Sequence, residues 1–557
     1  MLLLEAEPDR LRLFCRWCGW VVAAGVVVRL LGLWMDPLLW GDEAYLAHSV
    51  VRGDGGWGVF LEPLANRQVA APGFGWMSQV VWRWRGELGS LRWPGFAGGM
   101  VAMVVTGWLA WMLARGSGAG VDGRGGQQGV GAGRAGAGGA AGPAFWLGAA
   151  VAGGSWWLLR YSVELKGYTW DAAFAGVGWG LLCVQVRHRG RHQGRYWGRF
   201  VVGLLPGLLG VVGVWMSLTL AIVLAGAGAG LGLGMLMGRG AWGWRHWAGL
   251  VIGGLLAMVS GLVLWWAVME PYRSSETAGF MDWYWRGAGG FPERAEAWTA
   301  WWWLVSNLTG APFGHPLGVG AWSAVVWVGL WLWGGGGRGR GGEGTLAMVL
   351  GGPVVLAAVL GLVGVYPFGG HARVTLYLAP GVLAGVALGL LELHNRLGVR
   401  GRAWLWVVVM GLLLGNIGVF GGLQVWRGWS ERRAYPLREM LAEVRREAEA
   451  GALVVFWEEP DSSRGRGPEV QFSLYAEQAL GTDWIRSDRF DVPGVRQGQV
   501  VWVLAHDPGA GHWREGEKAG QIDAWLERLG VDLLEEGRYR FFPSGEHRVQ
   551  MVRFRGR

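Results

Sequence analysis

The sequence carries little charge for its length. Only 16% of its 557 residues are Asp, Glu, Lys or Arg, whereas 52% are hydrophobic. Soluble domains contain about 25% charged residues, and the mean hydropathy of this chain is +0.27. This deficit argues against a secreted or cytosolic globular protein and indicates a protein that lies in lipid.

Cysteines and nucleotide-binding motifs are also scarce. Of the three cysteines, Cys15 and Cys18 form one C-x-x-C inside an apolar stretch, and Cys183 lies in another. No second pair completes a metal site, so we interpret all three as packing residues. Neither G-x-x-x-x-G-K-[ST] nor a G-x-G-x-x-G between a strand and a helix occurs, so we predict no nucleotide site.

Long apolar stretches are abundant instead. A stretch of about 17 to 23 residues can cross a hydrocarbon core about 30 Å thick. The first stretch lacks a small-residue cleavage site, so we expect a retained helix there rather than a signal peptide. About eleven spans are predicted, near residues 13–34, 94–114, 144–159, 169–186, 200–216, 218–237, 246–268, 317–334, 345–365, 373–392 and 402–425.

Arginines are concentrated in short segments between these stretches, and they give the chain its net charge of +9. The positive-inside rule explains them better than nucleic-acid binding does. It predicts a cytoplasmic N-terminus and cytoplasmic loops at 115–143, 187–199, 238–245, 335–344 and 393–401. The Gly- and Ala-rich residues 116–142 are expected to form a flexible linker on that side.

The chain is predicted to have two domains. Residues 1–427 form the transmembrane domain, whose first outer loop, 35–93, has amphipathic stretches at 45–51 and 76–84. Residues 428–557 form a small soluble extracytoplasmic α/β domain. Its predicted elements are helices at 436–450 and 521–529 and strands at 453–457, 500–506, 538–542 and 548–554.

Adjacent carboxylates follow the first span in the segment LWGDEAYLAH, which contains Asp42 and Glu43. Such a pair at a membrane surface can bind a metal, act as a base, or be solvated. On its own, the pair therefore leaves all three interpretations open.

Two further polar clusters are predicted on the same side of the membrane. RYSVELKGYTWD brings Glu164, Lys166, Tyr168 and Asp171 to the membrane boundary, where ionisable groups serve function or pair with each other. In the structural alternative, Glu164 pairs with Lys166 and Arg160. YPFGGHARVTLYLAP adds His371 and Arg373 before a span, where an arginine can instead be an interfacial anchor.

These segments together carry a family resemblance. The pattern W-x-DE-x-Y-x-A at 40–47, QVAAPGFGWM at 68–77 and VELKGY at 163–168 are similar to motifs of the GT-C superfamily. RSSETAGFMDWYWRGAGGFP at 273–292 and YPFGGHAR at 366–373 are similar to its later motifs. These GT-C enzymes are membrane-embedded glycosyltransferases with lipid-linked donors, and the chain resembles family 39, which is protein O-mannosyltransferase-like, and the RgtA/B/C/D-like domain. One proline of the usual pair is missing from QVAAP.

The resemblance implies transfer of a sugar from a polyprenyl-phosphate donor to an acceptor hydroxyl on a glycan, lipid or protein. The reaction would take place on the extracytoplasmic face of the inner (plasma) membrane. It implies Asp42 as general base with Glu43 orienting it or the acceptor. The candidate donor-phosphate ligands are Lys166, Arg373 and His371. The candidate substrate contacts are Glu164, Tyr168, Asp171 and Gln68. Carboxylate oxygens suit Mg²⁺ or Mn²⁺, and the metal requirement stays open.

Two other function classes remain. A secondary transporter also has many spans with polar breaks, but its ionisable residues lie near the midplane. Here the acids lie at span ends and in outer loops, and no two-fold repeat of spans is evident. A non-catalytic scaffold or sensor, whose C-terminal domain binds a partner, is the third class.

Overall fold

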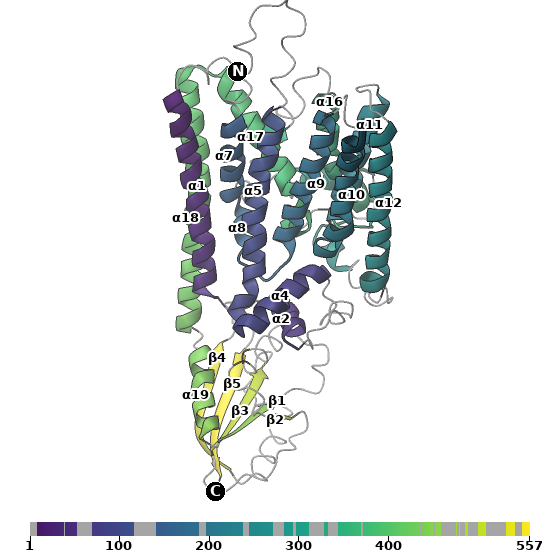
Figure 1. Ribbon diagram of the computed structural model, residues 1–557. Coiled ribbons are helices and arrows are strands. Elements are labelled where there is room, and N and C mark those ends of the chain that lie inside the picture. Colours follow the sequence, from purple (N-terminus) through teal and green to yellow (C-terminus); the bar gives the residue numbers. More distant parts are fainter. Residues whose placement is uncertain are drawn as a thin grey trace, which may run out of the picture.

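The structure is a computed structural model of the 557-residue chain (Figure 1). It describes residues 8–37, 39, 41–52, 70–115, 141–188, 196–237, 244–270, 283–292, 297–310, 328–331, 343–368, 371–434, 437–450, 452–457, 475, 478, 485–487, 500–507, 531–540 and 548–556.

A bundle of apolar helices makes up most of the molecule. Within the part of the chain that the structure describes, six helical segments are long and apolar enough to cross a membrane, and three shorter apolar helices accompany them. The protein is therefore a multi-pass membrane protein. The helices are α1 (Pro8–Met35), α5 (Trp93–Arg115), α7 (Ala141–Gly153), α8 (Trp156–Tyr161), α9 (Tyr168–His188), α10 (Tyr196–Met216), α11 (Leu220–Leu236), α12 (Trp244–Leu264), α14 (Ala297–Gly310), α16 (Glu343–Leu362), α17 (Ala379–Arg396) and α18 (Val399–Ala434).

Glycines allow pairs of these helices to pack closely. On α10, a Cβ atom added at Gly207 would lie 2.2 Å from the backbone of Gly253 on α12. On α11, a Cβ at Gly230 would lie 2.1 Å from the carbonyl oxygen of Met348 on α16. Small residues spaced by four are typical of helix contacts in membranes, where the hydrophobic effect does not drive association.

The predicted span at 144–159 is interrupted, which corrects the expectation of one continuous helix. Ser155 has an extended backbone (φ −66°, ψ 121°) between α7 and α8. Arg29 of α1 donates to the carbonyl oxygens of Gly153 and Ala152 at 3.0 and 3.5 Å. Asn416 donates to Gly154 O at 3.2 Å. These donors satisfy backbone groups that the break frees inside the bundle.

Helices α1 and α18 run side by side in the same direction. Near the N-terminal ends of the two helices, Phe14 contacts Trp406 with ring centroids 4.6 Å apart and ring planes tilted by 55°, and Gly428 approaches Met35 toward their other ends. The chain leaves both helices at the same end of the bundle. At that end lie α2 (Gly41–Arg52), α4 (Pro72–Arg85) and the C-terminal strands (Figure 1).

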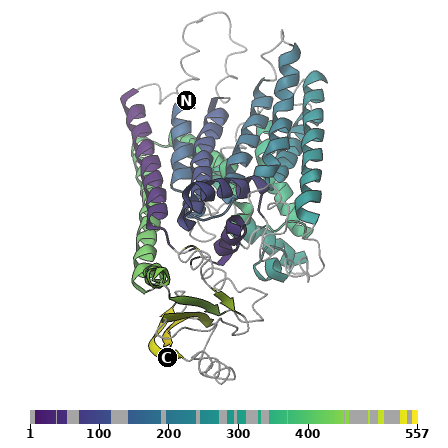
Figure 2. The ribbon, with the colours of Figure 1, turned by 60° about the horizontal axis from the view of Figure 1, so that its bottom comes forward.

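The C-terminal region forms a five-stranded mixed sheet preceded by helix α19 (Leu437–Glu449). Strand order is β2-β1-β3-β5-β4, with β1 parallel to β2 and β3 and with β5 antiparallel to β3 and β4. The strands are β1 (Leu453–Trp457), β2 (Ile485–Ser487), β3 (Val500–Asp507), β4 (Val531–Arg540) and β5 (Arg548–Gly556). Figure 2 shows α19 beside this sheet, following α18.

Most of the predicted spans coincide with a helix, and several details differ. The segment between the spans predicted at 246–268 and 317–334 contains α14, and the span predicted at 373–392 begins with the 3₁₀ helix η5 (Ala372–Leu378). The span at 317–334 is described at residues 328–331 alone, which are helical. The linker 116–142 lies outside the described residues except at 141–142, which begin α7, and the helix at 521–529 lies wholly outside them.

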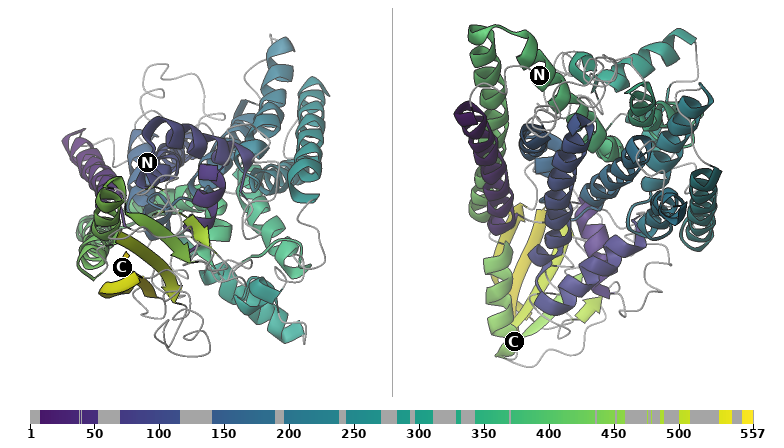
Figure 3. Two further views of the ribbon diagram at one scale, coloured as in Figure 1. Left: turned by 90° about the horizontal axis from the view of Figure 1, so that it is seen from below. Right: turned by 45° about the horizontal axis from the view of Figure 1, so that its top comes forward.

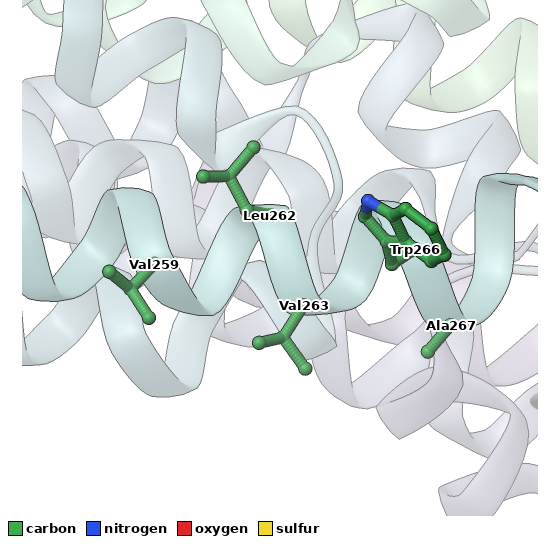
Figure 4. A pocket seen from close by; sticks show the side chains of 5 residues that line it. All are labelled: Val259, Leu262, Val263, Trp266 and Ala267. Atoms are coloured by element: carbon green, nitrogen blue, oxygen red, sulfur yellow. The ribbon is translucent and has the colours of Figure 1, made fainter.

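An apolar groove of about 460 Å³ lies on the outer surface of α12 and the π-helical turn η3 (Trp265–Met269). Figure 4 shows its lining, formed by Val259, Leu262, Val263, Trp266 and Ala267. None of these side chains is ionisable. The groove has the character of a surface in contact with lipid tails, and it is separate from the polar cluster described below.

Candidate functional site

Asp42 lies in the first turn of α2, at the end of the bundle that faces the C-terminal sheet. A helix N-terminus favours a carboxylate because the backbone N–H groups there point outward. Its Oδ2 accepts a hydrogen bond from Arg373 Nη1 at 2.8 Å and lies 3.8 Å from Lys166 Nζ. The Asp42 side chain is 29% exposed. Within the described residues, its Oδ1 has no hydrogen-bond partner.

Arg373 lies in η5 and connects Asp42 to the segment 283–292. Its Nη2 donates to the hydroxyl of Tyr284 at 2.7 Å, and its guanidinium lies 5.5 Å from the ring centroid of Trp285. The hydroxyl of Tyr366 donates to Val374 O at 3.1 Å, which holds η5 in place. The Nε of Arg373 is buried and has no hydrogen-bond partner among the described residues.

Lys166 is held in a compact turn between α8 and α9. Glycines at the start of α5 allow this turn to pack against the helix, since a Cβ at Gly95 would lie 2.5 Å from Glu164 O. Thr169 Oγ1 donates to Gly95 O at 2.8 Å, which fixes the turn from the other side. The turn buries Lys166 and directs its ammonium toward Asp42.

Glu164 pairs with Arg160 one helical turn earlier. The distance from Arg160 Nε to Glu164 Oε1 is 3.0 Å, and the arginine is 39% exposed while the carboxylate is 10% exposed. This contact agrees with the alternative interpretation of Glu164, in which its carboxylate forms an ion pair with Arg160. Its second oxygen, Oε2, is buried without a partner among the described residues. Unpartnered buried polar atoms are rare in native proteins, so both this oxygen and Arg373 Nε are candidate ligand contacts.

Glu43 points away from Asp42 and is fully buried. Its oxygens accept two hydrogen bonds from Arg92, at 3.0 and 2.7 Å, and one from the backbone N–H of Leu165 at 2.5 Å. Arg92 also donates to Pro37 O at 2.6 Å. Glu43 therefore joins the first loop to α5 and to the turn that carries Lys166. Removing one partner of such a buried pair costs about 3–5 kcal/mol.

Among the described residues, two cations, Lys166 and Arg373, lie within 4 Å of the Asp42 carboxylate, and the ion pair of Arg160 with Glu164 is close to them. Burial lowers the pKa of Lys166, and Asp42 opposes this change. Burial and the charge of Glu43 raise the pKa of Glu164, while Arg160 opposes that rise. An anion that entered here would meet an excess of cations in a partly dehydrated site.

His371 lies at the entrance to this cluster, as the residue before η5. Its ring centroid is 6.4 Å from that of Tyr284 and 6.0 Å from that of Trp285. Partial burial lowers the pKa of His371, and the charge of Arg373 lowers it further. The imidazole is therefore neutral at pH 7, and its expected role as a phosphate cation is limited to acidic pH.

The remaining predicted site residues lie elsewhere or are not described. Tyr168, the first residue of α9, packs against Tyr161 with ring centroids 5.3 Å apart and lies near Arg373. Asp171 instead accepts a hydrogen bond from Ser217 at 2.6 Å, at the junction of α10 and α11. Gln68 lies outside the described residues.

No group of three or more His, Cys, Asp and Glu side chains in the described part of the chain is arranged to hold a metal ion. The carboxylates of Glu43 and Glu164 are paired with arginines, and Asp42 faces two cations. This donor set does not fit Mg²⁺ or Mn²⁺, which need several oxygen ligands. We therefore assign no reaction step to a metal.

Two contributors to the site were absent from the sequence prediction. Arg92 binds Glu43, and Tyr284 binds Arg373. Arg92 could have been noticed because it lies immediately before an apolar span. An arginine at such a position is also typical of an interfacial anchor, so the position alone does not indicate a site residue. Tyr284 lies between Trp283 and Trp285 in DWYWR, and the sequence gave no reason to single it out.

Comparisons with known proteins found likeness at the level of structure. No family model matches the chain, and no curated protein matches it. The chain is similar to ArnT from Cupriavidus metallidurans bound to undecaprenyl phosphate, with 14% identity, a TM-score of 0.47, and coverage of 96% of this chain and 98% of that one. It is also similar to the Archaeoglobus fulgidus oligosaccharyltransferase tethered with an acceptor peptide, with 10% identity, a TM-score of 0.44, and coverage of 92% and 69%.

Proposed function

We propose that this protein is a glycosyltransferase that moves a sugar from a polyprenyl-phosphate donor to an acceptor hydroxyl, on the extracytoplasmic side of the inner membrane. The observation that carries the proposal is the arrangement at Asp42. One of its oxygens is held by Arg373 and faces Lys166, while the other has no partner among the described residues.

Asp42 is the proposed general base. The acceptor hydroxyl must lose its proton as its oxygen attacks the anomeric carbon, and a positioned carboxylate accelerates such a step by about 10² to 10⁴. Arg373 and Lys166 fix the Oδ2 side of the carboxylate. The Oδ1 side is then available for the acceptor proton. The bond from sugar to phosphate oxygen breaks as the bond to the acceptor oxygen forms.

The cations supply the other half of the reaction. The leaving polyprenyl phosphate gains negative charge as its bond to the sugar breaks, so positive groups next to it stabilise the transition state more than the ground state. Lys166 and Arg373 are buried or nearly so, and Arg160 is partly exposed beside them. The position of all three at the end of a membrane bundle suits a phosphate whose hydrocarbon tail stays in lipid.

Glu43 is proposed as a positioning residue. It makes no contact with Asp42 through its carboxylate, which is held by Arg92 and Leu165. Its proposed role is to fix the first turn of α2 against the turn that carries Lys166.

Release of polyprenyl phosphate from a panel of polyprenyl-phosphate sugars tests the proposal. We expect purified wild-type protein to release it with at least one donor and suitable acceptor, and Asp42→Asn to lower kcat by about 10² to 10⁴. An asparagine oxygen can still accept the hydrogen bond from Arg373, so the variant retains the fold.

Glu87→Gln is the matched control. Glu87 is an exposed carboxylate of the same loop, and it makes no side-chain hydrogen bond or ion pair with the described residues. Full activity in Asp42→Asn would remove Asp42 as the base. No turnover of any donor by wild-type protein would contradict the transferase and favour a membrane transporter.

A further inference from the structure

The C-terminal domain and the loop that carries Asp42 share one apolar core. Five buried residues of the C-terminal region belong to it: Leu441, Val444, Val454, Tyr475 and Trp502. They pack in the same cluster as Leu39 and residues Ala44, Leu46, Ala47 and Val50 of α2. Seen from below, the sheet lies on the side of the bundle near α1 and α18, away from α12 (Figure 3).

A buried hydrogen bond joins the two parts just before α2 begins. The backbone N–H of Leu39 donates to the hydroxyl of Tyr475 at 3.0 Å, across 436 positions of sequence. Leu39 is fully buried and Tyr475 is 3% exposed. Gly41 begins α2, and Asp42 is the next residue. Tyr475 therefore holds the chain three residues before the proposed base.

Tyr475 also lies near the second support of α2. The side chain of Tyr475 lies near that of Arg92, which binds Glu43. Glu43 in turn accepts the backbone N–H of Leu165, the residue before Lys166. One tyrosine of the C-terminal domain thus adjoins both the entry to α2 and the ion pair that fixes α2 to the Lys166 turn.

We propose that the C-terminal domain positions Asp42, and that Tyr475 is the positioning residue through which it acts. The consequence for catalysis rests on the proposed function, whereas the consequence for the order of α2 does not. Displacing a catalytic group by about 1 Å can lower a rate by about 10². A domain that holds the start of α2 therefore influences turnover without contacting the donor.

Tyr475→Phe tests the proposal because it keeps the ring in the apolar core and removes the hydroxyl that accepts from Leu39. We expect kcat to fall about tenfold or more, with the donor KM changed less than about threefold, because positioning acts on the transition state. We also expect faster hydrogen exchange across residues 39–52, since a buried N–H has lost its acceptor.

Trp502→Phe is the matched control. Trp502 lies in the same core, and its indole donates to Glu447 of α19 at 2.8 Å, so this variant also loses one hydrogen bond. We expect it to lower thermal stability while kcat per folded protein and exchange across 39–52 stay at wild-type values. A merely structural role for Tyr475 predicts the same behaviour in both variants.

The outcomes separate this proposal from the proposed function. Wild-type exchange across 39–52 in Tyr475→Phe would overturn the positioning role, whatever the activity. Faster hydrogen exchange that is confined to Tyr475→Phe supports the positioning role. This holds even if wild-type protein releases no polyprenyl phosphate from any donor, because that result would count against the transferase function alone. Faster exchange with unchanged kcat would overturn the link from Tyr475 to Asp42.

Discussion

At the residue scale, Lys166 stands apart from the other cations of the protein. It is one of two lysines, the other being Lys518, among 50 Lys and Arg residues. An ammonium is a compact point charge that can lose its proton when buried, whereas a guanidinium is larger and stays charged. Lys166 is buried, faces Asp42, and has a pKa lowered by that burial. At this position the chain therefore has a cation that is smaller than arginine and that can lose its proton.

Lys166→Arg is expected to lower kcat/KM about tenfold or more, because the larger group overpacks a buried position and displaces Asp42. Since burial lowers the pKa of Lys166 below its ordinary value of 10.5, its ammonium loses its charge at a lower pH than that of an exposed lysine. The wild-type kcat/KM should then decline on the alkaline side. Arginine stays charged there, so that decline should disappear in the variant.

A pH series of donor turnover in wild type, Lys166→Arg and Lys518→Arg measures this. The Lys518 variant makes the same chemical exchange at the other lysine and should retain the wild-type profile. An alkaline decline that persists unchanged in Lys166→Arg would mean that another group titrates.

At the scale of elements, glycine spacing decides which helices pack together. Gly203 and Gly207 on α10 face Gly249 and Gly253 on α12, and each pair is separated by four positions. An added Cβ at any of these four would lie 3.0 Å or less from the partner backbone. By contrast, a Cβ at Gly254 would meet no atom within 4 Å. Gly253 therefore packs against α10, whereas its neighbour Gly254 on the same helix has open space beside it.

Gly207→Ala is expected to lower the thermal stability of the detergent-purified protein by about 1–3 kcal/mol, because its methyl group forces α10 and α12 apart. Gly254→Ala places the same methyl group in open space and should be neutral or slightly stabilising, since alanine favours helices. Thermal unfolding of both variants followed by fluorescence provides the measurement. Equal melting curves for the two would show that the glycine contact does not determine packing of α10 and α12.

At the scale of the whole molecule, charge and geometry predict the same sidedness. The order of the predicted spans puts the arginine-rich loops on one side, and in the structure Asp42, Lys166, Arg373 and the C-terminal sheet lie at the end where α1 and α18 finish. The positive-inside rule assigns the arginine-rich side to the cytoplasm. A donor and acceptor would then meet at the opposite, extracytoplasmic face.

Single cysteines test this topology. Ala442→Cys on α19 and Gly398→Cys between α17 and α18 both lie at exposed positions. In intact spheroplasts, a membrane-impermeant maleimide should label Ala442→Cys, and it should label Gly398→Cys only after permeabilisation. Wild-type protein controls for its native cysteines, of which Cys18 and Cys183 are buried and Cys15 is partly buried. The reverse pattern would invert the proposed orientation.

Part of the site was predictable because its residues are polar groups at the ends of apolar stretches. Asp42, Lys166 and Arg373 stand out in three separate segments, and the structure brings Lys166 and Arg373 each within 4 Å of Asp42. The different environments of Asp42 and Glu43 were not predictable. Adjacent residues on a helix point about 100° apart, so one faces the cluster while the other meets Arg92.

The amino-acid sequence by itself determined that this is a multi-pass membrane protein with two regions, because apolar length and charge distribution depend on local composition. It also predicted which polar residues lie at the ends of apolar stretches. Tertiary structure alone decided that Glu43 pairs with Arg92, that Arg29 satisfies the break after α7, and that Tyr475 reaches Leu39. Such contacts join residues far apart in sequence, and their formation depends on how whole elements pack.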